Sequence, residues 1–510
     1  MGRVARLYRK LHKWPGFILS FILLYYGITG IFMNHREFFS GVDICRKNLP
    51  EEFRYLRWNN GALKGNLIVD EDSILVYGNI GIWVTDSTFR DYHDLNSGFP
   101  NGVDNRKIFD LHRSADGHLY AATQFGLYAL DPSRNQWQKF PLEVDITKFV
   151  ALESAGDTLY ALSRSYLFRG VSEGIHTQLQ RIELPAPADF INEVTLFETI
   201  WQVHSGEIFG IPGKLFVDAM GLVTIFLSLT GIIYFLLPGW IRRLRRKNRP
   251  ADTVIRLNKW SLKWHNYTGA WLFVFLLILF FTGMFLRPPL LIAIANAKVA
   301  PLRYSHLNQP NPWYDKLRDL LYDKENEVML LSSSQGMYAM ETGEMTLKPY
   351  DIQPPVSVMG ITALESFAGG AYLVGSFSGL FLWDPSNPEI YNYASGRVFS
   401  GSVTGRPVGD FAITGTLTDI DGNRYMVDYQ KGVLPLYHDQ PFPGMPSNVL
   451  DESGMSLWSL SLELHTGRLF GSLLGDFYIL IVPLTGLTGM IVVLSGYLLW
   501  RKKYRKKSQV

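Results

Sequence analysis

Two stretches of equal length decide the fold: residues 11–30 (LHKWPGFILSFILLYYGITG) and residues 264–283 (WHNYTGAWLFVFLLILFFTG). In each, a histidine (His12 or His265) stands seventeen residues before a Thr-Gly pair, and the residues between them are mostly apolar. An α-helix needs about 20 such residues to cross the hydrocarbon core of a bilayer. Both stretches therefore predict membrane-spanning helices that open at a histidine, and their likeness indicates an internal duplication.

A second matched pair of segments extends the duplication. Residues 203–210 (VHSGEIFG) precede the second apolar run, and residues 464–471 (LHTGRLFG) precede the fourth. His204 and His465 therefore stand in equivalent positions. The chain carries two pairs of histidines at the ends of its expected spans.

The second and fourth runs also match within the membrane. GLVTIFLSLTG starts at Gly221 and GLTGMIVVLSG at Gly486, and each ends on a second glycine, Gly231 or Gly496. The spacing from histidine to second glycine differs by four residues, about one helical turn, so the duplication is approximate there. Small residues let membrane helices approach closely. Both halves run in–out–in, so we expect parallel repeats related by a pseudo-twofold axis along the membrane normal.

Charge gives the spans a direction. The chain has 510 residues and a formal charge of +3, with basic clusters at RVARLYRKLHK, IRRLRRKNR and RKKYRKK. Each cluster abuts an apolar run, which favours positive-inside topology over nucleic-acid binding. The first run lacks a small-residue cleavage site, so we expect a retained span rather than a signal peptide. Both termini and the central basic segment then lie in the cytoplasm, and the two long segments lie outside, in a bacterium the periplasm.

This topology predicts a membrane core of four helices with a large outer domain supplied by two insertions. The four apolar runs are Phe17–Met33, Leu215–Leu237, Ala270–Leu286 and Phe477–Trp500. The expected parts are a cytoplasmic N-terminus with the first span (1–38), the first half of the outer domain (39–203), the second span (204–240), a basic cytoplasmic loop (241–264), the third span (265–288), the second half of the outer domain (289–464), the fourth span (465–500) and a basic tail (501–510).

The outer segments repeat as well. Residues 118–140 (HLYAATQFGLYALDPSRNQWQKF) resemble residues 371–393 (AYLVGSFSGLFLWDPSNPEIYNY), and four weaker copies accompany them. Period-2 alternation bounded by turn residues indicates antiparallel strands. Units of about 30–45 residues with several strands are typical of propeller blades. We expect one six-bladed β-propeller with three blades from each insertion, two β-sandwiches being the alternative, and a role in substrate docking or as a scaffold.

The histidines suggest the chemistry. Neutral imidazole is a common iron ligand, and two imidazoles hold a haem. His12 with His265 would form the cytoplasmic-side site, and His204 with His465 the outer site, giving two haems. The single cysteine excludes a CxxCH attachment motif, so each haem would be non-covalent. The cytoplasmic parts contain no dinucleotide or Walker motif, so electrons would come from a quinol or a separate reductase.

Other polar residues flank the spans. His35 has no partner in the repeat and is a further candidate ligand of the outer haem or an interfacial residue. Asp218 and Asp476 are expected at helix ends in contact with water, or as proton acceptors from a quinol. Arg36 and Arg287 would pair with haem propionates or reach to the membrane interface. No catalytic acid, base or nucleophile is predicted.

The span motifs resemble the PepSY-associated transmembrane family, which includes iron-regulated inner-membrane proteins and ferric-siderophore reductases. The resemblance rests on LHKWPGF with GITGIF, on HSGEIFG with GLVTIFLSLTG, on WHNYTGAW with FTGMF, and on HTGRLFG, in that order. It implies b-type haems held by His12, His265, His204 and His465, and reduction of siderophore iron on the periplasmic side. The outer region departs from the family pattern, because a PepSY domain is small and α/β whereas this region is large and all-β.

Three functions are compatible with these features. The first is a haem b inner-membrane reductase whose acceptor is ferric iron in a siderophore or another periplasmic chelate. The second is a non-enzymatic β-propeller receptor or scaffold for an envelope partner, anchored by the helices. The third, a transporter, is disfavoured because the spans lack deep charged residues and broken midplane helices.

Overall fold

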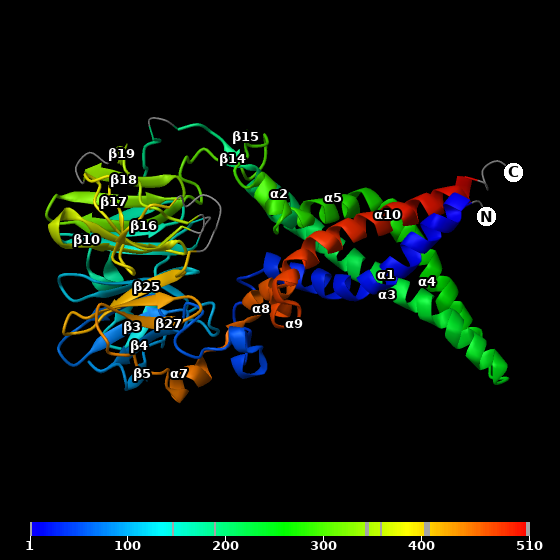
Figure 1. The fold of residues 1–510 in the computed structure, drawn as a ribbon, viewed down its shortest axis with the longest axis horizontal. Helices are drawn as coiled ribbons and strands as arrows, with labels where there is room; N and C mark the ends of the chain where they lie inside the picture. The colour runs from blue at the N-terminus through cyan, green and yellow to red at the C-terminus, as the bar shows by residue number, and fades with distance from the viewer. Residues whose placement is uncertain are drawn as a thin grey trace. The chain divides into compact units, whose positions relative to one another are not determined.

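The computed structural model describes residues 3–144, 147–187, 190–341, 346–357, 360–401 and 409–505. The chain divides into a helical unit and a β unit (Figure 1). The helical unit comprises Met1–Phe39, Ile191–Gln309 and Leu457–Val510, and the β unit comprises Ser40–Phe190 and Pro310–Ser456. The part of the basic tail predicted at 506–510 lies outside the described residues.

Among the described residues, three helices of the helical unit are long and apolar enough to cross a membrane, or four if a bent pair counts as one span. The long helices are α1 (Arg3–Asn34), α3 (Gly210–Arg246) and α10 (Ile481–Arg505). The pair is α4 (Asp252–Trp271) and α5 (Phe273–Met284), bent by 70°. Helix α1 packs against α3 and α10, while α3 also contacts α4 and α10 also contacts α5.

Two boundaries differ from the sequence-based expectation. The third span, expected as one segment over 265–288, is divided between α4 and α5. The basic segment 241–264, expected as a loop, is largely helical, because α3 continues to Arg246 and α4 begins at Asp252. The basic residues extend the helices beyond the apolar runs instead of interrupting them.

Glycines bring the helices together where the sequence predicts close approach. A Cβ placed on Gly27 of α1 would lie 2.9 Å from the carbonyl oxygen of Gly221 on α3. A Cβ on Gly486 of α10 would lie 2.8 Å from the carbonyl oxygen of Phe280 on α5. Both are closer than a side chain tolerates, so the two helix contacts depend on glycine.

The extra four residues of the second repeat form one additional turn. Helix α2 (Leu196–Ser205) ends at Gly206, and α8 (Leu457–His465) is followed by Gly467; both glycines are left-handed, at φ 81° and 77°. The second repeat then adds α9 (Gly471–Leu474) before the next break. The glycines at residues 210 and 475 share one backbone conformation, φ 62°, ψ −146° and φ 54°, ψ −145°, and each precedes its span's second glycine by twenty-one residues.

Within the described residues, the β unit contains six antiparallel sheets of three to five strands, each with its strands in sequence order, besides the two-stranded pair β1 and β28. Three of these six sheets precede the second span and three follow the third. Sheet 1 is β2 (Gly65–Ile68), β3 (Ile74–Gly78), β4 (Gly81–Thr85) and β5 (Tyr92–Asp94); sheet 2 is β6 (Ile108–Arg113), β7 (Leu119–Thr123), β8 (Gly126–Asp131) and β9 (Gln136–Lys139); sheet 3 is β10 (Phe149–Ala155), β11 (Thr158–Ser163), β12 (Leu167–Val171) and β13 (Gln180–Ile182). Sheet 4 is β16 (Leu317–Asp323), β17 (Val328–Ser333), β18 (Gly336–Glu341) and β19 (Leu347–Pro349); sheet 5 is β20 (Ile361–Ser366), β21 (Tyr372–Ser376), β22 (Gly379–Trp383), β23 (Tyr391–Asn392) and β24 (Arg397–Val398); sheet 6 is β25 (Ile413–Thr418), β26 (Arg424–Asp428) and β27 (Gly432–Leu436).

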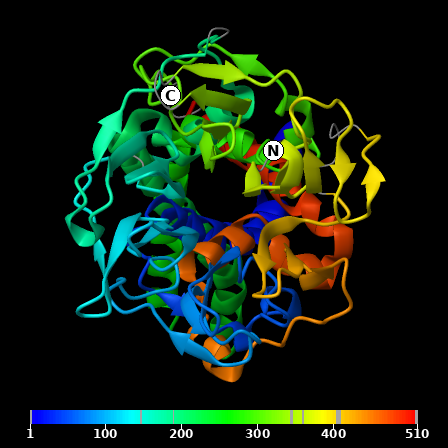
Figure 2. The same ribbon diagram turned by 90° about the vertical axis from the view of Figure 1, so that its left-hand side faces the viewer.

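The sheets contact one another in a cycle. The first strand of each sheet touches the first strand of the next, and β25 touches β2 (Figure 2). Six separate apolar clusters lie one between each pair of successive sheets, including the pair of sheets 6 and 1. The cluster that closes the cycle contains Trp58 and Trp83 from the start of the unit with Leu417 and Val427 from its end.

Short elements complete the two units. The remaining helices and strands are β1 (Asp43–Ile44), paired with β28 (Met455–Ser456); β14 (Val194–Thr195), paired with β15 (Lys298–Val299); α6 (Leu290–Ile294); α7 (Ser447–Glu452); and the 3-10 helices η1 (Arg46–Asn48), η2 (Glu51–Phe53), η3 (Gly174–His176), η4 (Glu207–Phe209), η5 (Ala368–Gly370), η6 (Arg468–Phe470) and η7 (Gly475–Leu480).

Candidate functional site

The helical unit brings together the four histidines that the sequence singled out, in the predicted pairs. His12 of α1 and His265 of α4 have ring centres 6.0 Å apart, with the ring planes at 72°. His204 of α2 and His465 of α8 have ring centres 6.3 Å apart, at 66°. We call these the inner pair and the outer pair.

Every one of these rings is held through its Nδ1 atom. The Nδ1–H groups of His12, His265 and His204 donate to backbone carbonyl oxygens at 2.8, 3.1 and 3.2 Å; the acceptors are Val492, Leu227 and Leu279. His465 Nδ1 lies 2.9 Å from the Thr29 hydroxyl, which itself donates to Tyr25 O and therefore accepts from the ring. A proton fixed on Nδ1 leaves the Nε2 lone pair free, which is the tautomer a metal-binding histidine needs.

A hydroxyl residue followed by glycine on a neighbouring helix seats each ring. The Thr230 hydroxyl is 3.0 Å from His265 Nδ1, and the Thr282 hydroxyl is 3.1 Å from His204 Nδ1. In the fourth span Ser495 donates at 3.0 Å to the same carbonyl oxygen that holds His12. The seating positions are therefore repeated in all four spans.

The glycine of each seat lies directly against the imidazole ring. A Cβ added at Gly496 would lie 2.7 Å from His12 Cε1, and one at Gly283 would lie 2.8 Å from His204 Cε1. At Gly231 and Gly30 the corresponding distances to the rings of His265 and His465 are 3.4 and 3.5 Å. Sequence reasoning gave Gly30 a role in helix packing and used Gly231, Gly283 and Gly496 as markers of the duplication, without connecting any of them to a histidine ring. Their signal was the Ser/Thr-Gly dipeptide common to all four spans, read together with the histidines.

The pairs fit a bis-histidine haem. A metal–imidazole bond is about 2 Å long, and a ring nitrogen lies about 1 Å from the ring centre, so imidazoles on opposite sides of one ion have centres about 6 Å apart. The observed 6.0 and 6.3 Å agree with that separation. The free Nε2 atoms supply the donors, and the glycines leave space for the rings. No cluster of three or more His, Cys, Asp or Glu that suits a bare metal ion is found among the described residues.

The two pairs lie far apart along the spans. His465 rests against Thr29, which stands seventeen residues after His12 on the continuous helix α1. Seventeen helical residues rise about 25 Å, close to the ~30 Å thickness of a hydrocarbon core. The geometry therefore suits one site near each face of a membrane.

The other predicted residues lie around the outer ends of the spans. His35 Nε2 is 2.6 Å from Asp218 Oδ2, so a carboxylate engages the nitrogen that would bind a metal. Arg36 stacks its guanidinium 3.9 Å over the Trp458 ring, and Asp476 is exposed on η7. Arg287 follows α5 and interacts electrostatically with Arg468.

A cluster of ionisable side chains joins the inner strands of the β unit. Asp110 of β6 accepts hydrogen bonds from the Leu152 N–H of β10 at 2.7 Å and from the Tyr77 hydroxyl of β3 at 3.3 Å, so one carboxylate links three sheets. Burial raises the pKa of Asp110 to about 6. Burial, and then the neighbouring Asp110, raises the pKa of Glu153 to about 8.

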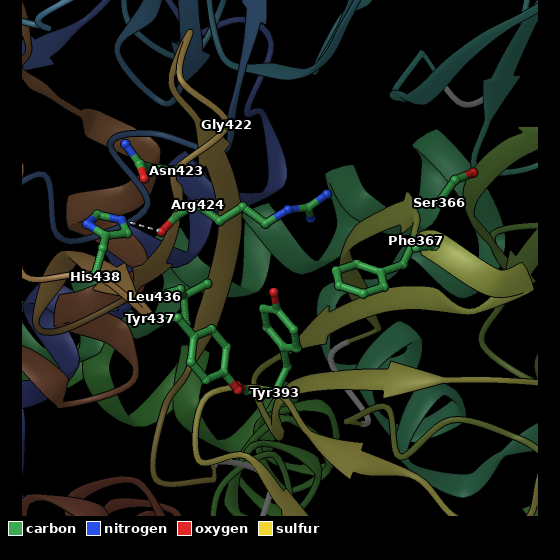
Figure 3. Close-up of a pocket in the computed structure, with 10 residues that line it drawn as sticks. Ser366, Phe367, Tyr393, Gly422, Asn423, Arg424, Leu436, Tyr437 and His438 are labelled. Carbon is green, nitrogen blue, oxygen red and sulfur yellow. Dashed lines mark hydrogen bonds between the residues drawn. The ribbon is translucent and has the colours of Figure 1, made fainter.

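The β unit also has a hollow of about 480 Å³ between sheets 5 and 6. Figure 3 shows the Arg424 side chain extending toward Phe367, with the guanidinium 5.2 Å from the ring centre. Arg424 pairs with Glu365 at 2.9 Å, and its carbonyl oxygen contacts His438 Nε2 at 2.9 Å. Glu365 therefore compensates the charge of Arg424 at the lining of the hollow, and the other groups that line it include the aromatic rings of Phe367, Tyr393 and Tyr437.

Fold and site together define a membrane protein with an internally duplicated helical core that presents two imidazole pairs. The chain belongs to the family described as the PepSY-associated TM region, whose sequence model matches residues 2–237 and again residues 237–503. The two matches correspond to the two halves of the duplication. None of the curated proteins matches this sequence.

Solved structures give only distant likenesses. The extracellular domain of BT4673 from B. thetaiotaomicron is 12% identical over 76% of this chain and 39% of its own, with a TM-score of 0.34. The N-terminal domain of Nup159 is 9% identical over 73% of this chain and 74% of its own, with a TM-score of 0.32. This chain therefore spans about two fifths of the first of these proteins, and at such scores neither likeness bears on function.

Proposed function

We propose that this protein is a haem b oxidoreductase of the bacterial inner membrane. It would pass electrons from the cytoplasmic side or the quinol pool to a periplasmic acceptor, ferric iron in a siderophore or similar chelate. The observation that carries the proposal is the pair of matched imidazole sites, each with Nδ1 bonded to the chain and Nε2 free.

In this proposal the four histidines are ligands and perform no acid–base chemistry. His12 with His265 would hold the inner haem, and His204 with His465 the outer haem. When bound, each haem supplies a one-electron redox centre. The carbonyl and hydroxyl groups at Nδ1 fix the ring orientation and raise the basicity of Nε2. The seating glycines set the depth of each ring.

The direction of transfer follows from topology. We place both termini and the basic segment around 247–251 in the cytoplasm by the positive-inside rule, and the β unit in the periplasm. The sequence offers no nucleotide-binding motif on the cytoplasmic side, so the donor would be a quinol or a separate reductase. Reduction would release iron, because oxygen donors that suit ferric iron hold the softer ferrous ion less well.

We further propose that the β unit is a six-bladed propeller that docks the acceptor or an envelope partner. The six sheets, their cyclic contacts and the six apolar clusters between them support this architecture. Sheet 6, with three strands, would be the shortest blade.

The direct test is a pyridine haemochrome assay on the purified full-length protein. We expect two haems per chain in the wild type and one in each of His12→Ala, His265→Ala, His204→Ala and His465→Ala. His35→Ala is the matched control, because its Nε2 faces Asp218, and it should retain two. A wild-type protein without reducible Soret and α bands would refute the reductase and leave the anchored receptor as the better account.

A further inference from the structure

The two halves of the duplication carry different charges beside the outer pair. Arg287 stands five residues after Thr282, where the first half has Asn34 five residues after Thr29. Arg468 stands three residues after its histidine, where the first half has Glu207. The residues two positions before the histidines are Glu463 in the second half and Gln202 in the first. Two positions that are neutral or acidic in one half are therefore basic in the other.

In the first half the polar groups at these positions are largely paired. Asn34 Nδ2 donates to Asp218 Oδ1 at 2.9 Å and to Ser205 O at 3.1 Å. Glu207 pairs with Lys214 at 2.9 Å. At these positions, the buried atom without a hydrogen-bond partner among the described residues is Gln202 Oε1. It is an acceptor and therefore does not bind an anion.

In the second half two cations share one carboxylate. Arg468 Nη2 is 2.5 Å from Glu463 Oε1, and Arg287 lies within electrostatic range of both residues. The Nε atoms of Arg287 and Arg468 are buried and have no hydrogen-bond partner among the described residues. Two buried donors therefore remain unmatched among the described residues, and an unpaired buried polar group is costly.

The two arginines stand close in the chain to residues that form or hold the outer pair. Arg468 follows His465 on η6, and Arg287 follows Thr282, the hydroxyl that seats His204. Tyr26, whose ring stacks on that of His465 at 4.7 Å, also interacts with Arg287. A planar guanidinium fork matches the geometry of a carboxylate through two parallel hydrogen bonds.

We infer that Arg287 and Arg468 together hold a carboxylate at the edge of the outer histidine pair. The inference rests on the proposed function. It places the anion-binding side of the outer site in the second half of the duplication. A carboxylate there has two sources, a propionate of the outer haem or a carboxylate of an anionic acceptor.

The test uses full-length protein whose wild type has first been shown to bind two haems, and follows Arg287→Gln, Arg468→Gln and the double variant. Arg303→Gln, an exposed arginine of the helical unit, is the control. Arg287→Lys keeps the positive charge and removes the guanidinium fork. It replaces Arg287→Gln if that variant does not fold, and a partial effect is expected. For each variant we measure the rate of haem transfer to apomyoglobin and the KM for ferric citrate and for a neutral ferric hydroxamate.

If the carboxylate is a propionate, loss of the arginines speeds the transfer of one haem to apomyoglobin and leaves the other unchanged, and the difference from the wild type disappears after reconstitution with haem dimethyl ester. If it belongs to the acceptor, haem transfer stays at the wild-type rate and KM rises severalfold for ferric citrate but not for the neutral chelate. Unchanged haem transfer and unchanged KM values in a protein that still binds two haems overturn the inference alone. Absence of haem from the wild type overturns the proposed function on which it rests.

Discussion

Substitution of Gly496 by alanine should abolish the inner haem site while the equivalent substitution in the other half does not. A Cβ added at Gly496 would lie 2.7 Å from His12 Cε1 and 2.9 Å from its Nδ1. The ring must withdraw by about 0.7 Å to restore the 3.4 Å of an ordinary carbon contact. Metal sites tolerate about 0.2 Å in ligand distance, so the required movement is several times too large.

The withdrawal also affects the bond that orients the ring. His12 Nδ1 is 2.8 Å from Val492 O on α10, the helix that also carries Gly496. A shift of about 0.7 Å away from α10 would bring that separation to about 3.5 Å, at which a hydrogen bond is essentially lost. Loss of such a supporting bond alone lowers metal affinity about 10–100-fold. We therefore expect Gly496→Ala to be purified with one haem.

Gly231→Ala is the matched control. It is the symmetry-related glycine, and its Cβ would meet His265 Cε1 at 3.4 Å, an ordinary contact. The assay is haem per chain by pyridine haemochrome, with circular dichroism to show that each variant is folded. If Gly496→Ala keeps two haems with the wild-type spectrum, or if Gly231→Ala loses as much haem, the reasoning from ring seating is wrong.

Three further predictions concern other parts of the chain. Thr29→Val removes the hydroxyl that accepts a hydrogen bond from His465 Nδ1 at 2.9 Å, so the affinity for the outer haem should fall about tenfold. The measurement is the rate of haem transfer to apomyoglobin, and a rate equal to that of the wild type would contradict the prediction. Gly27→Ala should lower the free energy of unfolding of the helical unit by about 1–3 kcal/mol, because its Cβ would lie 2.9 Å from a backbone oxygen of α3. Gly239→Ala is the control, because a Cβ there would face open space and should leave the stability unchanged. Thermal melts in detergent compare the two variants. The pKa of Glu153 is about 8 in the folded protein, above its unfolded value, so its contribution to the free energy of unfolding is full below pH ~4 and is lost as the pH rises through 8. Glu153→Gln should therefore flatten the decline in melting temperature between pH 5 and 8. A decline as steep as that of the wild type would refute this prediction.

The histidine pairs were predictable because two independent signals coincide. The duplication matched His12 with His265 and His204 with His465, and the basic clusters placed each pair at one end of the spans. Both signals are linear in the sequence and need no packing information. The structure then adds what they lack, the ring separations of 6.0 and 6.3 Å and the acceptors at Nδ1.

Other features were hidden because local sequence does not encode them. The 70° bend between α4 and α5 falls at Leu272, inside a continuous apolar run where hydropathy shows no break. The four additional residues of the second repeat were visible as a spacing difference, but only backbone conformation places them in α9. The role of Gly496 depends on a ring that comes from the opposite end of the chain.

The duplication explains why both a symmetric site and an asymmetric surface occur in one chain. Each histidine pair takes one ligand from each half, so neither half alone provides a pair. The cycle of sheets likewise takes three sheets from each half, and it closes only where β25 meets β2. Within one chain, however, the flanking positions are free to diverge, as Arg287 and Arg468 have diverged from Asn34 and Glu207. In the proposed function the matched histidines would hold the metal, and the unequal flanks would give the outer pair a single charged side toward which a carboxylate is drawn.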